Sequence, residues 1–324
     1  MKVEYPHLNS DIQYPATITR AKLKDAFVSW ANLESFIDGI TQSLYNGAYI
    51  NRYNFTRGLI AKAYNDNSVT IEQISEPNTE ALAKAFLTKA RADYLNMQEP
   101  SSDFNAWKKV GGYGRDVITW TNPEDIVFLI RNDIGAYIDV NVLSEAFHIN
   151  KAELLGRVKY VKDFSERNNS GEVVIDGSNI VAMMADRRWF RIKNQELTMD
   201  EFYNSNNRTW NLYLNDVNMF QYSLFTNAKV YATALPEVTI TGMEAEKDSV
   251  EVAIGSSVKV MLTTTPAQAN TPTISVASSA SGVATASISG KEITITGVDD
   301  GTATITATAG NVTETISVTV PAAS

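Results

Sequence analysis

The sequence predicts an α+β domain over residues 1–235, followed by an all-β sandwich over residues 236–324. Every Trp, Tyr and Phe lies in the first of these segments, and the second contains none. In the second segment Val, Ile and Ala alternate with Ser and Thr, which is typical of half-buried antiparallel strands. At 324 residues the chain is long enough for two domains that each bury a core.

The first domain is predicted to begin with an extended segment and a helix. Apolar and polar residues alternate over residues 1–20, whereas from Ala21 to Leu44 the apolar residues recur every three or four positions. The second pattern indicates an amphipathic helix. It is compatible with a break near residues 31–32, and Asn46-Gly47 is expected to end the helix.

Helices continue up to about residue 97. The Thr79 hydroxyl and the Glu80 charge suit a helix start, because both favour the free amides of a first turn. The expected elements are a helix over 49–64 ending at Asn65-Asp66-Asn67, a strand over 69–74, a helix from 78 or 79 to 97, and a loop over 98–117.

The rest of the first domain is predicted to consist mainly of short strands. Residues 126–130 form a continuous apolar run, as expected of a buried strand. Residues 212–220 fit a helix or a strand, and both remain open. Other strands are expected at 158–161, 180–185, 189–192 and 228–232, with a short helix at 139–146. Trp30 and Trp189 are expected to be core residues, because each adjoins other apolar residues in phase.

The residue types that usually carry catalysis are scarce. The chain has no Cys, which excludes disulfides, zinc–thiolate sites and thiol nucleophiles. His7 and His148 are far apart in sequence, and we interpret both as exposed or helix-capping residues. Gly111-Gly112-Tyr113-Gly114 is too short for a phosphate-binding loop and lacks its Lys-Ser/Thr ending. A glycosidase-type pair of distant carboxylates stays open. We therefore predict no enzyme, no cofactor and no catalytic, cofactor-binding or metal-binding residue.

Two charged clusters have both a functional and a structural interpretation. Asp186-Arg187-Arg188, followed by Trp189-Phe190, has paired arginines that suit phosphate or carboxylate binding. The favoured interpretation is a hairpin turn with its charges in water and the two aromatic residues entering the core. Asp299-Asp300-Gly301 lies between two alternating segments and predicts a tight hairpin. A calcium site would need more oxygen ligands.

Charge is distributed unevenly along the chain. Residues 237–324 hold three Lys and nine acidic residues, a net charge of −6, whereas the preceding residues hold 25 basic and 28 acidic residues, a net charge of −3. Neither segment is basic overall, as a dedicated nucleic-acid-binding protein would be, although a locally basic inner face stays open. Met1–Tyr14 does not resemble a signal peptide, and no apolar run approaches a membrane span.

An ordered set of segments in the first domain carries a family resemblance. The segments are 26–37 (AFVSWANLESFI), 43–47 (SLYNG), Tyr53, 58–60 (GLI), Asn132-Asp133, Val142-Leu143, Ala146-Phe147, 158–164, 185–190 (ADRRWF) and 225–228 (FTNA). In this order they resemble the major capsid proteins of small podoviruses of the phi-29 type, over about residues 1–235. The resemblance implies the Hong Kong 97-like fold, with a peripheral domain containing a long spine helix, an axial domain, an extended loop and an N-terminal arm.

The last segment carries a second resemblance. Its marks are 238–240 (VTI), 250–252 (VEV) with Gly255, Thr265-Pro266, Val283-Ala284 and 301–307 (GTATITA). These are similar to bacterial Ig-like group 2 domains, which implies an Ig-like sandwich over 236–324. Such a C-terminal domain also occurs within the phi-29-like capsid family.

The N-terminal part departs from the family pattern. An arm, a helix and the first side of the extended loop are expected before the helix that contains Trp30, yet that helix begins within thirty residues of Met1. Residues 1–20 are therefore interpreted as the returning side of the loop, and the chain as either truncated or a shortened variant. We expect mainly peripheral helices and loop over about 21–120, and mainly axial strands and helices over about 120–235.

The resemblance implies a structural protein. Many copies would self-assemble through pentamers and hexamers into the icosahedral shell that encloses phage DNA, within a virion made in the host bacterial cytoplasm. Scaffold and portal proteins are candidate partners, and packaged DNA would contact the inner face without sequence specificity. The Ig-like domain is expected to project outward, with host-surface glycans as its candidate ligand, and no membrane partner is expected. The alternative is a secreted or surface adhesin with an Ig-like accessory domain.

Overall fold

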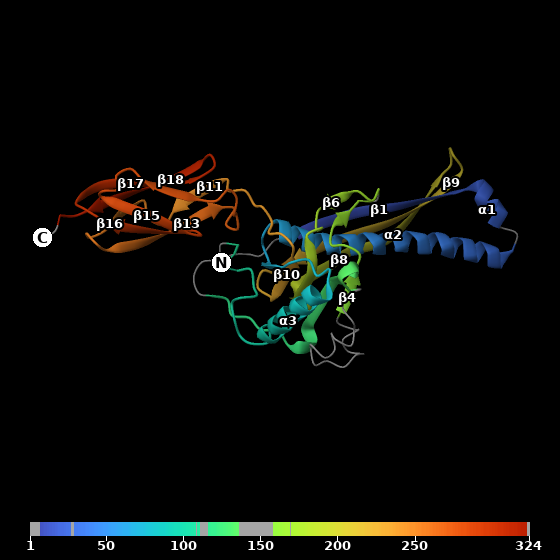
Figure 1. The fold of residues 1–324 in the computed structure, drawn as a ribbon. Helices are drawn as coiled ribbons and strands as arrows, with labels where there is room; N and C mark the ends of the chain where they lie inside the picture. Colours follow the sequence, from blue (N-terminus) through green and yellow to red (C-terminus); the bar gives the residue numbers. More distant parts are fainter. Residues whose placement is uncertain are drawn as a thin grey trace. The chain divides into compact units, whose positions relative to one another are not determined.

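The computed structural model describes residues 7–26, 29–107, 109–110, 116–135, 158–168 and 170–322 (Figure 1). The expected helix at 139–146, His148 and Gly111–Gly114 lie outside the described residues. The chain forms two compact units. The first comprises residues 1–64, 70–105 and 118–234, and the second comprises residues 65–69, 106–117 and 235–324.

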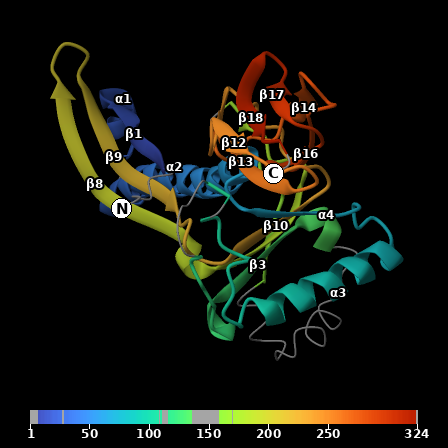
Figure 2. The same ribbon diagram turned by 90° about the vertical axis from the view of Figure 1, so that its left-hand side faces the viewer.

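The first unit contains a three-stranded antiparallel sheet with a long helix against one face. In sheet order the strands are β1 (His7–Thr19), β9 (Thr209–Tyr222) and β8 (Phe190–Asn204). The helix is α2 (Trp30–Asn65), and the short α1 (Arg20–Ala26) precedes it. Figures 1 and 2 show α2 running beside these strands. Leu214 of β9 is buried against Leu44 and Ala48 of α2, which fixes the face of the sheet that the helix covers. The expected extended segment is confirmed over β1, and residues 212–220 are strand.

Helix α2 does not end at Asn46-Gly47, so the expectation of two helices separated there was wrong. The reason is a tertiary contact, since a Cβ on Gly47 would lie 3.2 Å from the ring of Tyr14 in β1. Glycine at this position admits the close approach of the strand instead of ending the helix. The end near residue 65 is confirmed, and Asn67 follows it with a φ of 51°, in the left-handed region.

The first unit also contains a five-stranded mixed sheet. Its order is β2 (Thr70–Gln73), β10 (Ala228–Ala232), β7 (Ile180–Asp186), β3 (Ile126–Arg131) and β4 (Val158–Val161). All seven residues of the central strand β7 are buried, which explains its continuous apolar sequence. Phe86 of helix α3 (Glu80–Asn96) packs edge-on against Tyr231 of β10, with ring centroids 5.3 Å apart. The Thr79 hydroxyl accepts a hydrogen bond from the Leu82 amide, which confirms the predicted helix start.

Each of the two large sheets of the first unit, together with the helix that packs on it, combines segments from both halves of the domain. Helix α3 packs on the five-stranded sheet, although it lies in the first half of the domain. The β8–β9 ribbon lies in the second half, yet it pairs with β1 at the N-terminal end. Figure 2 shows α3 and the β8–β9 ribbon on opposite sides of the unit. The shorter elements are η1 (Pro123–Asp125), α4 (Asn132–Gly135), β5 (Glu166–Arg167), β6 (Val173–Ile175) and η2 (Arg187–Trp189).

Residues from 242 to 320 of the second unit form a two-sheet sandwich. One sheet has the order β11 (Gly242–Ala245), β13 (Ser257–Thr265), β16 (Glu292–Gly297), β15 (Ala284–Ser289). The other has the order β12 (Ser249–Glu251), β18 (Val312–Val320), β17 (Gly301–Ala309), β14 (Ser275–Ser278). Alternate aliphatic residues such as Ile293, Ile295 and Ile305 fill the core between them, as the period-two pattern predicted.

Asp299-Asp300-Gly301 does not form the expected hairpin. The strands on either side, β16 and β17, belong to different sheets of the sandwich, so the segment is a crossover between the sheets. Gly301 has a φ of +140°, and a Cβ there would lie 3.2 Å from the side chain of Val283. The turn residues were recognised correctly from the sequence, but the partner of each strand is set by the packing of the two layers.

Candidate functional site

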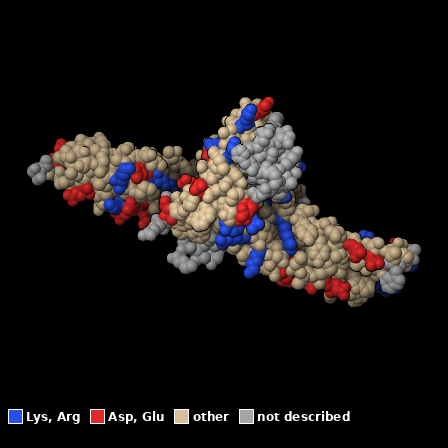
Figure 3. Space-filling view, turned by 90° about the horizontal axis from the view of Figure 1, so that it is seen from below, with Lys and Arg blue, Asp and Glu red and all other residues tan. Residues whose placement is uncertain are grey.

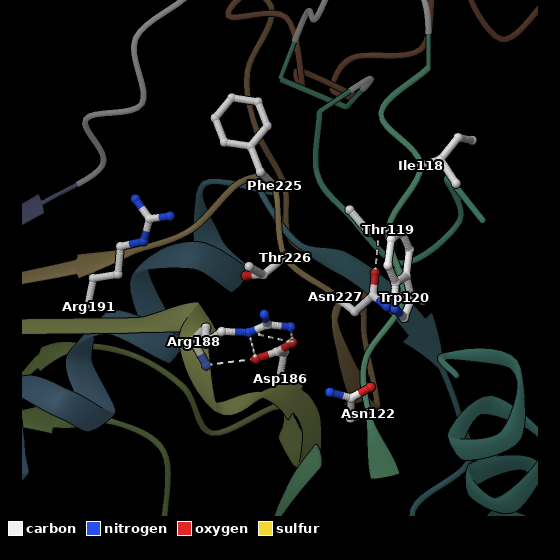
Figure 4. Close-up of a pocket in the computed structure, with 10 residues that line it drawn as sticks. All are labelled: Ile118, Thr119, Trp120, Asn122, Asp186, Arg188, Arg191, Phe225, Thr226 and Asn227. Atoms are coloured by element: carbon white, nitrogen blue, oxygen red, sulfur yellow. Dashed lines mark hydrogen bonds and ion pairs between the residues drawn. The ribbon is translucent and has the colours of Figure 1, made fainter. Parts of the chain in front are cut away.

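The Asp186-Arg187-Arg188 cluster lies beside a polar pocket of about 540 Å³ in the first unit (Figure 4). The pocket is lined by Ile118, Thr119, Trp120, Asn122, Asp186, Arg188, Arg191, Phe225, Thr226 and Asn227. It is formed where the chain leaves β7 in one sheet and enters β8 in the other, through the turn η2. The cluster is therefore a junction between two sheets, and the expected hairpin turn was wrong.

Asp186 is the centre of this junction, and only 1% of its surface is exposed. It accepts hydrogen bonds from the Arg188 side chain, with Nε at 2.9 Å and Nη2 at 2.6 Å, and from the Arg188 backbone N–H at 2.8 Å. The Thr121 hydroxyl donates a further bond at 3.1 Å. Burial by itself would raise the pKa of Asp186, but the bonds from Arg188 and Thr121 hold it below its ordinary value. The expectation that the charges of the cluster lie in water is wrong for Asp186, but it is confirmed for Arg187 and Arg188, whose side chains are 69% and 59% exposed.

The same network includes Asn227, which precedes β10. Its side-chain amide donates to the Met97 carbonyl at 3.1 Å and to the Thr121 hydroxyl at 3.2 Å. The Asp186 backbone N–H donates to the Asn227 carbonyl at 2.9 Å. These bonds hold together the end of α3, the segment before η1 and the junction after β7. Because the polar atoms named here bond one another, the arrangement suits a structural role better than a reactive one.

A second buried polar cluster joins α3 to the five-stranded sheet. The Lys229 ammonium donates to Asp93 at 2.9 Å and lies 3.2 Å from Glu72, and the Tyr231 hydroxyl donates to Asp93 at 2.8 Å. Burial, followed by the charge of Asp93, raises the pKa of Tyr231 well above its ordinary value. The phenol therefore stays protonated and donates its hydrogen bond. Within the described ranges, no group of three or more His, Asp or Glu residues could hold a metal ion.

Large apolar side chains are exposed on several elements of the first unit, and the largest groups lie on α2 and β8. On α2 these are Ile37, Tyr49, Ile50 and Tyr53, and on β8 they are Ile192, Leu197, Met199, Phe202 and Tyr203. Ile37 also lines a hollow of about 220 Å³ together with Trp210 and Leu212 of β9. Clustered exposed apolar residues usually mark a surface that another protein covers. The sequence did not single out these residues, because their apolar pattern is the same as that of a buried face.

The remaining sequence-based expectations have the following outcomes. Trp189 is a core residue, with 1% exposure and its ring stacked on Tyr222 at a centroid distance of 5.1 Å. His7 is the first residue of β1, in register with Gln221. Trp30 is the first residue of α2, and its side chain lies outside the described part of the structure. Among the described helices, none combines the length and apolar character needed to span a bilayer.

Comparison with known families gives two matches. Residues 1–232 match the family described as Phi29-like phage major capsid protein, and residues 239–320 match the bacterial Ig-like domain (group 2). The major capsid protein of Bacillus phage B103 is 29% identical over 244 residues, covering 74% of this chain and 50% of the relative. That of Bacillus phage PZA is 30% identical over 231 residues, covering 70% and 47%. The chain thus spans about half the length of these curated relatives.

Solved structures agree with the family match at the level of the fold. A chain of the Staphylococcus phage Andhra capsid has a TM-score of 0.54 and 12% identity, and the match covers 70% of both chains. A chain from the bacteriophage P68 structure has a TM-score of 0.50 and 14% identity, covering 70% of this chain and 71% of its own length. The expected phage capsid fold, followed by an all-β Ig-like region, is confirmed.

Proposed function

Because this chain belongs to the Phi29-like phage major capsid protein family, we propose that it is a structural subunit of an icosahedral shell that encloses phage DNA. The observation that carries this proposal is the family match over residues 1–232. The likeness to a phage capsid chain in fold supports it. The protein would be synthesised in the host bacterial cytoplasm and would become part of the virion.

Assembly, and not catalysis, is the proposed activity. Identical subunits that contact one another side to side form closed rings, here pentamers and hexamers, when the rotation between them closes. Stable contacts of this kind usually bury more than about 1,000 Å². The exposed apolar residues on α2 and β8 offer surfaces for such contacts. The polar clusters around Asp186 and Asp93 are proposed to stabilise the subunit and not to react.

The proposed domain division is a shell domain over residues 1–235 and an Ig-like domain over residues 236–324. Within the shell domain, α2 and the three-stranded sheet are proposed as the peripheral domain, and α3 with the five-stranded sheet as the axial domain. The packing of α3 on the five-stranded sheet and the pairing of β9 with β1 and β8 support this assignment. Strand β1 would be the returning side of the extended loop.

The Ig-like domain is proposed to project from the outer surface and to be dispensable for the shell lattice. Its net charge of −6 over residues 237–324 would make contact with packaged DNA unfavourable. It also lacks the aromatic and Arg residues that dominate strong protein interfaces. Scaffold and portal proteins, non-specific contacts of DNA with the inner face, and host-surface glycans are further partners in this proposal.

Electron microscopy of particles from the wild-type chain and from a chain lacking residues 237–324 tests these proposals. We expect closed shells from both, with density outside the shell only for the wild type. Wild-type protein that yields neither shells nor capsomer-like rings would overturn the capsid function and would favour the adhesin alternative. Density for the Ig-like domain inside intact shells, or loss of assembly on its deletion, would overturn its outward placement alone.

A further inference from the structure

Strand β8 is an open edge of the three-stranded sheet. In the described part of the chain, its partner is β9, and its other side carries no strand. All residues from 191 to 203 are exposed. An edge strand of this length presents unpaired backbone N–H and C=O groups that can pair with a strand from another molecule. The charged residues and the β-bulge of β8 discourage indiscriminate pairing. A strand that pairs with this edge would therefore have to match its charge pattern.

The two edges of this sheet differ in their capacity for pairing. Strand β1, at the other edge, contains Pro15, which has no backbone N–H to donate. Strand β8 contains neither Pro nor Gly over its 15 residues. Its one irregularity is the bulge between Asn194 and Glu196. The edge of β8 is therefore better suited to pairing than that of β1.

The charges along β8 divide between its two halves. Arg191 and Lys193 lie in the first half, Glu196 lies next to the central Leu197, and Asp200 and Glu201 lie in the second half. Such a strand is complementary to a second copy of itself running in the opposite direction, whereas a parallel copy in register would place like charges together.

The side chains that would meet lie on a common face. Lys193 is in register with Met219 of β9, and Asp200 with Tyr213. Along β9, Met219 and Tyr213 alternate with residues that face α2, such as Leu214 and Phe220. The ring of Phe220 stacks on the ring of Phe55 in α2. Lys193 and Asp200 therefore share the face that points away from the helix.

The opposite face of β8 supplies apolar contact area. Leu197 and Met199 lie on the same side of the sheet as the buried Leu214, because Met199 is in register with Leu214 and Leu197 with Asp216. Leu214 is covered by α2, but Leu197 and Met199 remain 40% and 38% exposed. A second β8 strand beside the first would cover these two side chains.

We propose that β8 pairs in antiparallel fashion with β8 of a second copy of this chain, about a twofold axis that passes through Leu197. In this register Leu197 faces Leu197 of the second copy, and Lys193 faces Asp200 of the second copy. Asp200 is the third residue after Leu197. Lys193 is the third paired residue before it, because Gln195 is the extra residue of the bulge and is skipped in the pairing. The inference rests on the proposed capsid function and specifies one of its subunit contacts.

Cysteine cross-linking tests the position of the axis, and the chain has no native Cys to interfere. Leu197→Cys places two thiols opposite each other at the axis, close enough for a disulfide or a short bismaleimide linker. Ile192→Cys is the matched control on the same strand, since its two copies would lie more than about 20 Å apart. We expect covalent dimers from Leu197→Cys at least tenfold above Ile192→Cys. Equal cross-linking of both variants, or none from either, would overturn the proposed register.

A charge exchange provides a second test. Lys193→Asp and Asp200→Lys should each weaken association by roughly five- to thirtyfold, because the symmetric contact contains the charge pair twice. The double variant, which exchanges the two charges, should restore it. Association is measured by analytical ultracentrifugation of the free protein and by particle yield. Shells that form normally with both single variants would overturn the β8 contact but leave the capsid function standing. If the wild-type protein never forms shells but the Leu197→Cys variant still forms covalent dimers, the capsid function would be overturned and the β8 contact would stand.

Discussion

Arg52 of α2 donates two hydrogen bonds to the carboxylate of Asp216 on β9, through Nε at 3.0 Å and Nη2 at 2.5 Å. Only 2% of Asp216 is exposed, and the Asn194 amide of β8 donates to the same carboxylate at 3.2 Å. This carboxylate therefore joins the helix to two strands of the sheet.

Replacing Asp216 with Ala should lower the free energy of unfolding of the first unit by about 3 kcal/mol, because Arg52 would lose its partner at a partly buried site. Urea denaturation followed by tryptophan fluorescence would measure the change. Asp11→Ala, at an exposed position of β1 on the other face, is the control and should change stability by less than about 0.5 kcal/mol. Similar losses from the two substitutions would contradict a structural role for the Arg52–Asp216 pair.

Glu166 on β5 should make stability depend on pH. Its carboxyl packs against Gly58 of α2, where a Cβ would collide with it, and its Oε2 atom has no hydrogen-bond partner among the described residues. Burial raises the pKa of Glu166 above its ordinary value of 4.5. The folded state therefore holds this proton more tightly than the unfolded state, and stability falls as pH rises from about 4.5 through the folded-state pKa.

Glu166→Gln should remove this dependence. We expect a higher urea midpoint for the variant at pH 7 and no difference from the wild type below about pH 4, where both states of the wild type are protonated. Glu172→Gln, an exposed position in the segment before β6, is the control. A variant that is less stable than the wild type at pH 7 would show that the charged form of Glu166 is favoured in the fold.

Trp189→Ala should destabilise the first unit by about 3–5 kcal/mol, because it removes a fully buried aromatic side chain that stacks on Tyr222. Trp120→Ala is the matched control, since Trp120 is 58% exposed. Chemical denaturation of both variants gives the comparison. A loss below about 1 kcal/mol for Trp189→Ala, with assembly selectively lost, would show that the ring serves a partner and not the core.

Residues 236–324 should fold without the rest of the chain. This segment contains both sheets of the sandwich and the core between them, and Leu235-Pro236-Glu237 has the composition of a linker. Expressed alone, it should give dispersed amide signals in an NMR spectrum and an all-β circular dichroism spectrum. A collapsed, disordered spectrum would contradict its independence.

The sequence predicts the local elements better than their partners. The start of α3 at Thr79 and the buried strand at 126–130 could be recognised because a cap and an apolar run are local signals. Gly47 was misread as a helix end, since the reason for a glycine there is the ring of Tyr14, 33 positions earlier in the chain. Local patterns do not show such contacts.

The same limit applies to the candidate site. The Asp186-Arg187-Arg188 cluster was recognised, but it was expected to form a hairpin turn, because the sequence does not show that β7 and β8 belong to different sheets. Its bonds to Thr121 and to Asn227 cross long stretches of the chain. The open edge of β8 likewise depends on strand order and could not be read from composition.

The pairing of β1 with β9 bears on how the protein folds during synthesis. His7 is in register with Gln221, so the first strand has no partner until more than two hundred residues have been translated. Until then the backbone groups that β1 shares with β9 have no strand to pair with. About a hundred residues follow β9 in the chain, and their translation takes roughly 5–20 s at bacterial rates. Because the Ig-like domain is translated after β9, the pairing of β1 with β9 can form while the sandwich is still being synthesised.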